Sequence, residues 1–191
     1  MYKNPQVINT ANEIIDLLIK HGGSEYIGEP VTKFEHSIQS AMIAEETGLD
    51  DELIIAALLH DIGHICVENS ENNDMNGYGV IDHELIGAKF LKEKGFSNRI
   101  VETVANHVPA KRYLCYKHAD YYDALSDASK NTLKFQGGPM TDMEAAEFES
   151  NLYFEDIIKI RKIDEMAKIE NTPMPLSLHH YRNKILKLLT K

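Results

Sequence analysis

Apolar residues recur every three or four positions along most of the chain, which is the spacing of an amphipathic helix. No stretch alternates between apolar and polar residues as a half-buried strand would. We expect a first helix that Asn9 or Thr10 caps and that Gly22-Gly23 end. Its apolar residues should face the core, namely Ile14, Ile15, Leu18 and Ile19. The same spacing predicts further helices over about 32–47, 82–94, 97–107 (closed near Pro109), 113–127, 152–168 and 177–189. The chain is therefore predicted to be all-α, with a single domain.

One predicted helix has no polar face. Seven consecutive apolar residues, Leu53 to Leu59, lead directly into His60-Asp61. A helix that is apolar all round is normally buried, and this one falls far short of the about 20 residues that cross a membrane. A buried carboxylate is costly unless it binds a metal or is hydrogen-bonded. We therefore expect a core helix, capped by Asp50, whose C-terminal end carries chemistry.

Two polar segments rich in turn-forming residues interrupt the helical pattern. The first covers residues 68–80, and the second is the QGGP stretch at 136–139. Long loops of this kind are usually functional or mobile. Thr141 and Glu144 follow with the spacing of a capping box, so another helix is expected to begin at Thr141.

The overall charge excludes several classes of partner. The 191 residues carry a formal net charge of −10, whereas nucleic acids and anionic membranes require a cationic surface. We therefore expect neither nucleic acid nor a membrane as a partner. An anionic small molecule would need a local group of lysine and arginine residues in an otherwise acidic protein.

The two cysteines fit a reducing compartment. Cys66 and Cys115 form neither a disulfide framework nor a CxxC pair. The N-terminal residues lack the charged and apolar regions of a signal peptide. We expect a cytoplasmic location.

Histidine and aspartate recur where the predicted helices end. The residues that could converge on one interior site are His36, His60, Asp61, His64, His83, His107 and Asp164. Imidazole and carboxylate donors without thiolate suit iron, manganese, zinc or cobalt. Four histidines and two carboxylates are enough for two ions, with Asp61 between them. The remaining histidines have no spacing that ties them to this set and are assigned to the surface, namely His21, His118, His179 and His180.

The order H…HD…H…H…D resembles the pattern of HD-domain metalloproteins. Within these proteins, the chain resembles the branch of oxygenases with a mixed-valence di-iron centre, which act on hydroxyphosphonates. The stretches that carry the resemblance are YIGE (26–29), FEHS (34–37), AALLHDIGH (56–64), GYGV..HE (77–84), HV.AKRYL (107–114), LSDAS..TL..QGGPM (125–140), KIR..DE (159–165) and HYR (180–182). HD alone is shared with many phosphohydrolases, whereas YIGE, AKRYL and QGGPM together are far more specific.

The resemblance implies an HD-domain helical bundle that fills residues 1–191. Its parts would be an N-terminal helix and lid loop over about 1–31, a catalytic helical core over about 32–170, and a C-terminal helix over about 177–191.

It also implies two iron ions in the mixed-valence Fe(II)/Fe(III) state and O2 as co-substrate. The residues that would hold one iron are His36, His60, Asp61 and Asp164. Asp61 would bridge to the second iron, which His83 and His107 also hold.

Roles outside the metal ligands follow from the same resemblance. Tyr26 would close an open coordination site until substrate arrives, and Glu29 would contact the amine of the substrate. The phosphonate group would be bound by His64, Lys111, Ser129 and Arg161, with Thr132 and Gln136 as further neighbours.

The implied reaction is cleavage of the carbon–phosphorus bond of (R)-2-amino-1-hydroxyethylphosphonate to phosphate and glycine, in organophosphonate catabolism. A 2-oxoglutarate-dependent hydroxylase would make this substrate. Two alternatives stay open. One is the related oxygenase for the N-trimethylated substrate, and the other is a metal-dependent HD phosphohydrolase that uses a metal-activated water.

Overall fold

A computed structural model describes residues 4–26, 28–67 and 73–190, and the ordered elements in these ranges are helical. In chain order they are α1 (Pro5–His21), α2 (Lys33–Glu46), α3 (Asp51–Leu59), the 3-10 helix η1 (Ile62–His64), α4 (His83–Glu93), α5 (Asn98–Ala105), α6 (His107–Lys117), α7 (Ala119–Ala124), α8 (Asp127–Phe135), α9 (Asp142–Glu149), α10 (Phe154–Met166) and α11 (His179–Leu189). Apart from two isolated bridges, these ranges hold no extended pairing. The all-α prediction is confirmed.

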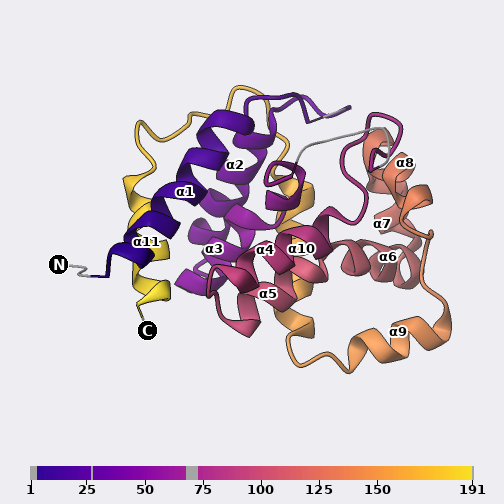
Figure 1. Ribbon diagram of the computed structural model, residues 1–191. Helices are drawn as coiled ribbons and strands as arrows, with labels where there is room; N and C mark the ends of the chain where they lie inside the picture. The colour runs from indigo at the N-terminus through magenta and orange to yellow at the C-terminus, as the bar shows by residue number, and fades with distance from the viewer. Residues whose placement is uncertain (1–3, 27, 68–72, 191) are drawn as a thin grey trace.

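Helix α3 is the centre of the largest apolar core. All seven residues from Leu53 to Leu59 are buried, and α3 packs against α2, α5, α10 and α11. Helices α1 and α11, the first and last helices of the described chain, pack against each other at one side of this core (Figure 1). Since α3 has a neighbour on every side, its C-terminal end opens into the interior rather than into water.

A smaller apolar cluster lies at the other side of the molecule. It joins α6, α9 and the start of α10 through the rings of Tyr113, Phe148 and Phe154, whose centroids lie 5.3 to 5.5 Å apart. Figure 1 shows α9 at the outer edge of this region, below α6. The cluster holds α6 against α10, so that His107 and Asp164 face the same interior as α3.

Two predictions for the first helix are wrong. The helix begins at Pro5, because Asn4 caps it by accepting a hydrogen bond from the Gln6 amide, and proline suits the first helical position. Ile19 is 57% exposed, although Ile14, Ile15 and Leu18 are buried as expected. The inner face of α1 is narrower than its apolar spacing predicts.

The segment from Ser97 to Asp127 divides differently from the prediction. Pro109 does not close a helix but lies in the first turn of α6, where the missing amide hydrogen costs nothing. The helix expected over 113–127 is three helices, α6, α7 and α8. Helix α8 was not expected, and it carries several residues of the site described below.

Other local predictions are confirmed. Asp50 caps α3, and Thr141 and Glu144 form the predicted box at α9. A second capping box, formed by Thr32 and Glu35 at α2, was not predicted. Residues 68–72 of the long polar loop lie outside the described residues. The four histidines assigned to the surface are exposed.

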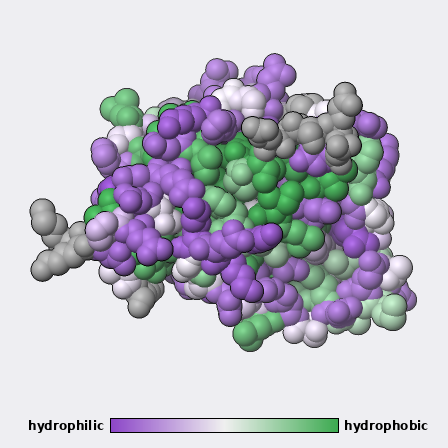
Figure 2. All heavy atoms as spheres, in the orientation of Figure 1, coloured by the Kyte–Doolittle hydropathy of each residue, from purple (hydrophilic) through white to green (hydrophobic). Residues whose placement is uncertain are grey.

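Hydrophilic residues cover much of the face shown in Figure 2, and apolar residues gather near its centre. Across the described part of the chain, no helix combines the length and the apolar character needed to cross a bilayer.

Candidate metal centre and substrate cavity

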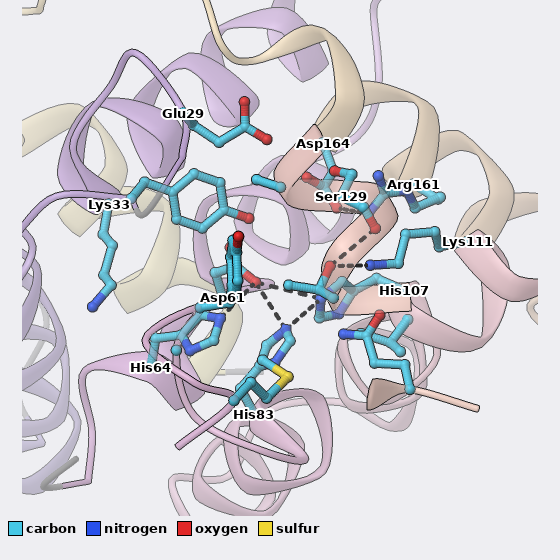
Figure 3. A pocket seen from close by; sticks show the side chains of 18 residues that line it. Glu29, Lys33, Asp61, His64, His83, His107, Lys111, Ser129, Arg161 and Asp164 are labelled. Carbon is cyan, nitrogen blue, oxygen red and sulfur yellow. Dashed lines mark hydrogen bonds and ion pairs between the residues drawn. The ribbon is translucent and has the colours of Figure 1, made fainter. Parts of the chain in front are cut away.

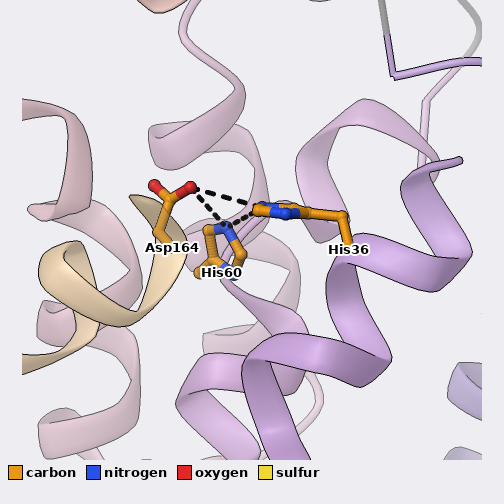
Figure 4. A group of neighbouring side chains, drawn as sticks. All are labelled: His36, His60 and Asp164. Carbon is orange, nitrogen blue, oxygen red and sulfur yellow. Dashed lines mark hydrogen bonds and ion pairs between the residues drawn. The ribbon is translucent and has the colours of Figure 1, made fainter. Parts of the chain in front are cut away.

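The six residues predicted as metal ligands meet in the interior, in two groups of three. His36 of α2, His60 at the end of α3 and Asp164 of α10 form the first group (Figure 4). His83 of α4 and His107 of α6 form the second group with Asp61. In each group the candidate donor atoms lie within 4.8 Å of one another, and all six residues are buried.

Asp61 lies between the two groups and faces both. Its Oδ2 is 3.6 Å from His36 Nε2 and 3.5 Å from His60 Nε2. Its Oδ1 is 3.2 Å from His83 Nε2 and 3.4 Å from His107 Nε2. The carboxylate therefore has the position of a bridge between two ions.

The backbone fixes which nitrogen of each histidine faces the site. The Nδ1 atoms of His36, His60 and His107 each lie 2.8 Å from a backbone carbonyl, and His83 Nδ1 lies 3.3 Å from the Val80 carbonyl. A carbonyl only accepts, so each Nδ1 carries the hydrogen and each Nε2 offers a lone pair.

The Nε2 atoms of the four histidines lie close together two by two. His36 Nε2 and His60 Nε2 are 3.0 Å apart, and His83 Nε2 and His107 Nε2 are 3.1 Å apart. Two donors at right angles around one metal ion, each at about 2.1 Å, lie roughly 3 Å apart. The spacing therefore suits one cation between each pair.

The carboxylates support the same conclusion. Asp61 Oδ2 and Asp164 Oδ1 are buried, and neither has a hydrogen-bond partner among the described residues. Burial alone would raise the pKa of Asp61, but His60, His107 and His83 hold that pKa well below its usual range. Buried, ionised and unpartnered oxygens beside imidazole lone pairs fit two metal ions.

A glycine brings the HD segment close to α4. Helix α3 ends at Leu59 and η1 begins at Ile62, so His60 and Asp61 lie in the turn between them, and both face the site. A Cβ on Gly63 would lie 1.9 Å from the carbonyl oxygen of His83. Only glycine permits this approach, which places His83 next to Asp61.

A cavity of about 40 Å³ lies beside the two groups (Figure 3). Every residue predicted for catalysis or substrate binding borders it, namely Tyr26, Glu29, His64, Lys111, Ser129, Thr132, Gln136 and Arg161. Four of the six predicted metal ligands also border it, namely Asp61, His83, His107 and Asp164. The structure thus brings the whole predicted set to one place.

One end of the cavity is cationic. Lys111 is buried and donates to Thr132 Oγ1 at 2.9 Å. Burial, with the nearby Arg161 cation, lowers the pKa of Lys111 to about 7. Lys111 forms no ion pair with a carboxylate among the described residues, so its charge, close to that of Arg161, is available to an anion.

Arg161 links this end to the first metal group. Its Nη1 donates to Asp164 Oδ2 at 2.5 Å, its Nη2 pairs with Glu165, and its Nε donates to the Tyr121 hydroxyl at 2.8 Å. The bond to Oδ2 leaves the other oxygen, Oδ1, 3.3 Å from His36 Nε2. Arg161 therefore aims Asp164 while its own position is fixed by three partners.

His64 differs from the four histidines of the metal groups. Its Nδ1 accepts a hydrogen bond from the Val80 amide at 3.1 Å, so its Nε2 carries the hydrogen. Nε2 lies 4.0 Å from Asp61 Oδ1, and the ring stacks on His83 with centroids 3.9 Å apart. His64 thus presents a donor, not a lone pair, to the cavity.

The loop before α2 supplies the opposite wall. The ring of Tyr26 stacks on His36 with centroids 4.5 Å apart. Glu29 Oε1 accepts from Ser126 Oγ at 2.6 Å and from Lys168 Nζ at 2.9 Å. These contacts join the loop to the segment that precedes α8.

Comparison with known proteins agrees with this geometry. A model of the HD domain matches residues 34–125. A glycine-betaine-forming 1-hydroxy-2-(trimethylamino)ethyl phosphonate dioxygenase of Leisingera caerulea is 42% identical over 90% of this chain and 86% of that enzyme. A hydroxymethylphosphonate dioxygenase of Gimesia maris is 40% identical over 90% of this chain and 84% of that enzyme. The chain belongs to the HD-domain phosphonate dioxygenases.

It is therefore an oxygenase, and the predicted resemblance is confirmed at the level of the family. An uncharacterized protein of Acanthamoeba polyphaga mimivirus is also similar, with 41% identity over 97% of this chain and 84% of that protein. The family is metal-dependent, which agrees with the two groups of donors in this oxygenase.

Sequence reasoning missed several residues of the oxygenase site. Lys33 borders the cavity, whereas Tyr121 and Lys168 support residues that do. Burial lowers the pKa of Lys33. Lys33 precedes the quoted FEHS stretch and Lys168 follows KIR..DE, so only their nearness to those stretches could have pointed to them.

Proposed function

We propose that this chain catalyses the O2-dependent oxidative cleavage of the carbon–phosphorus bond of a 1-hydroxyphosphonate. The observation that carries the proposal is a cationic cavity end, with Lys111 and Arg161, next to two groups of buried metal donors. The names of the relatives from Leisingera caerulea and Gimesia maris support a phosphonate as the substrate class.

The two metal ions are proposed to be iron, in the mixed-valence state that the resemblance implies. His36, His60 and Asp164 would hold one ion, His83 and His107 the other, and Asp61 would bridge them. When bound, the irons supply the redox chemistry that O2 requires as co-substrate. The donor set supports this choice, because imidazole and carboxylate without thiolate suit iron.

The phosphonate is proposed to lie at the cationic end of the cavity. Lys111 and Arg161 offer positive charge, and Ser129 and Thr132 offer hydroxyl groups there. Gln136 borders the same cavity, and its buried Oε1 has no partner among the described residues. His64 donates through Nε2 from the side of Asp61. These residues orient the substrate so that C1 faces the metal groups.

Tyr26 is proposed to close the site until substrate arrives. Its ring lies on His36, and it borders the cavity. The cavity of about 40 Å³ is small, so movement of this wall would make room for a hydroxyphosphonate. Closure around the substrate would also exclude bulk water from the reaction.

The overall reaction balances in atoms and electrons. A 1-hydroxyphosphonate and one O2 give a carboxylic acid and phosphate. The bonds from C1 to hydrogen and to phosphorus break, one oxygen atom enters each product, and the four electrons lost by the substrate reduce O2. From (R)-2-amino-1-hydroxyethylphosphonate, the substrate that the sequence resemblance implies, the acid is glycine.

We propose that the substituent on C1 of the substrate carries an amine. Glu29 borders the cavity and would face an ammonium group, as the resemblance implies. The N-trimethylated substrate of the Leisingera caerulea relative is the second candidate. Its quaternary amine would bind against aromatic faces, and the two aromatic residues on the described cavity wall are Tyr26 and Tyr78.

The proposed reaction needs a preceding hydroxylation step. A hydroxylase must supply the C1 hydroxyl group from an unhydroxylated phosphonate. We place both steps in the cytoplasm, because Cys66 and Cys115 are free thiols.

An assay of iron-loaded protein with (R)-2-amino-1-hydroxyethylphosphonate tests the function. Phosphate and glycine formed only in the presence of O2 support the oxygenase and this substrate. Phosphate formed equally without O2 would move the activity to a phosphohydrolase. If nothing forms, the N-trimethylated analogue is tried under the same conditions, and its turnover would assign the substrate to that alternative.

A further inference from the structure

Glu29 is already paired with a cation in the structure. Its Oε1 accepts from Lys168 Nζ at 2.9 Å and from Ser126 Oγ at 2.6 Å. The two charged side chains are only 6% and 10% exposed. The carboxylate expected to receive the ammonium group of the substrate therefore has a buried counter-ion of its own.

Lys168 is fixed in this position by three oxygen atoms. Besides Glu29, its ammonium donates to Ser129 Oγ at 3.0 Å and to Glu165 Oε1 at 3.0 Å. An ammonium group has three hydrogens, so each has an acceptor. Burial alone would lower the pKa of Lys168, but Asp164 and Glu165 outweigh it and the pKa is raised. Lys168 is a permanent charge at physiological pH.

The two members of the Glu29–Lys168 pair differ in their position relative to the cavity. Glu29 and Ser129 are among the described residues that border the cavity, whereas Lys168 is not. Figure 3 shows Glu29 across the cavity from His83. Among the described residues, Oε2 of Glu29 has no hydrogen bond, so this oxygen is available to a substrate while Oε1 holds Lys168.

A compensated carboxylate attracts a second cation less than a free one does. Charges interact strongly where little water screens them, and the attraction of Glu29 for an ammonium is offset by the repulsion from Lys168. An uncharged substituent experiences neither force. The balance between the two buried side chains thus sets how strongly the cavity distinguishes a charged from an uncharged substituent.

We propose that Lys168 is a specificity-determining residue, which by pairing with Glu29 weakens the preference of the cavity for an ammonium group and admits 1-hydroxyphosphonates with small uncharged substituents. The inference rests on the proposed function, because it concerns the C1 substituent of the same substrate. It extends the substrate class from amines to uncharged hydroxyphosphonates.

Two substrates of nearly equal shape test the proposal. In (R)-2-amino-1-hydroxyethylphosphonate the substituent ends in an ammonium, and in 1-hydroxypropylphosphonate of the same configuration a methyl group replaces it. The quantity measured is the ratio of kcat/KM for the amine to kcat/KM for the methyl compound. We expect wild-type protein to turn over both, with a ratio within about tenfold of one, which corresponds to ~1.4 kcal/mol.

Lys168→Met removes the counter-ion and keeps most of the side-chain volume. We expect it to raise the ratio at least roughly tenfold. Lys168→Arg keeps the charge and should leave the ratio near that of wild type. Lys159→Met removes an exposed lysine of α10 and is the matched control. An unchanged or lowered ratio in a folded, metal-loaded Lys168→Met protein would overturn the proposal.

Glu29→Gln provides a second variant if Lys168→Met does not fold. It removes the negative charge that Lys168 faces at the cavity, while the pairing of Lys168 with Glu165 remains, so the ratio should fall roughly tenfold below that of wild type. A ratio that stays at the wild-type value in Glu29→Gln would contradict the proposal as well.

A binding measurement separates this proposal from the proposed function. 2-Aminoethylphosphonate and propylphosphonate lack the C1 hydroxyl and differ in the same terminal group. The affinity ratio of this pair, measured by calorimetry, should rise in Lys168→Met whether or not the protein turns over a substrate. If no substrate is turned over but the affinity ratio rises in Lys168→Met as expected, only the proposed function is rejected. Absence of binding of both compounds to wild type would reject both.

Discussion

Arg161 donates to Asp164 Oδ2 at 2.5 Å, and this bond turns the free Oδ1 of Asp164 toward His36 and His60. The same arginine borders the cavity proposed to hold the phosphonate. One side chain thus connects the anion-binding end of the cavity with a proposed metal ligand. A bound phosphonate would therefore interact with a guanidinium group that already donates hydrogen bonds to Asp164, Glu165 and the Tyr121 hydroxyl.

Tyr121 is expected to position this arginine. Its hydroxyl accepts from Arg161 Nε at 2.8 Å, and burial raises the pKa of that hydroxyl to about 12, so it stays protonated. Tyr121→Phe keeps the ring and removes one bond to a charged group, worth ~1 to 2 kcal/mol. We expect KM for the phosphonate to rise roughly fivefold to thirtyfold while metal content stays constant. Tyr122→Phe, on an exposed neighbour, is the control, and an equal effect in both variants would contradict this role.

Asp61 is expected to be required for both metal ions. Because its two oxygens face different groups of histidines, Asp61→Asn removes a charge from both. His83→Ala should remove one ion only, since His83 lies in the second group. Metal analysis of purified proteins checks this. We expect about two equivalents in wild type, one in His83→Ala and fewer than one in Asp61→Asn. Equal metal loss in both variants would argue against a bridging position.

Gly63 is expected to matter for the second metal group. Its added Cβ would lie 1.9 Å from the His83 carbonyl oxygen and 2.7 Å from the His83 carbonyl carbon, so Gly63→Ala must push α4 away from η1. We expect a loss of about 1 to 3 kcal/mol in the free energy of unfolding, together with weaker binding of one metal ion. Chemical denaturation and metal titration measure the two effects. Gly23→Ala, where the added Cβ meets nothing within 4 Å, is the control.

Lys111 is expected to make substrate binding depend on pH. Burial and Arg161 lower its pKa to about 7, so the lysine is charged below this pH and neutral above it. A phosphonate binds the charged form better, and KM should therefore rise as the pH increases through about 7. Lys111→Arg stays protonated and should remove this part of the pH dependence. Identical pH profiles of KM in the two proteins would exclude Lys111 as the group that titrates.

The sequence alone predicted features that depend on interactions between residues close together along the chain. Helical spacing and caps such as Asp50 and Thr141 act between residues at most a few positions apart, so the all-α fold could be predicted. The apolar run before His60-Asp61 predicted that Asp61 is buried, and a buried carboxylate is costly unless it binds a metal or is hydrogen-bonded. The six proposed ligands followed from that run and from the resemblance, and the structure places them in two groups.

Tertiary structure decided which side chains meet. Lys168 lies 139 positions from Glu29, and Ser126 lies 97 positions from it, so no local pattern connects them. The exposure of Ile19 also depends on how much of α1 the core covers. The sequence by itself determined the all-α fold class and the donor types of the metal site. Packing between distant helices determined that Asp61 faces both groups and that Glu29 carries its own counter-ion, because charges and lone pairs interact through space rather than along the chain.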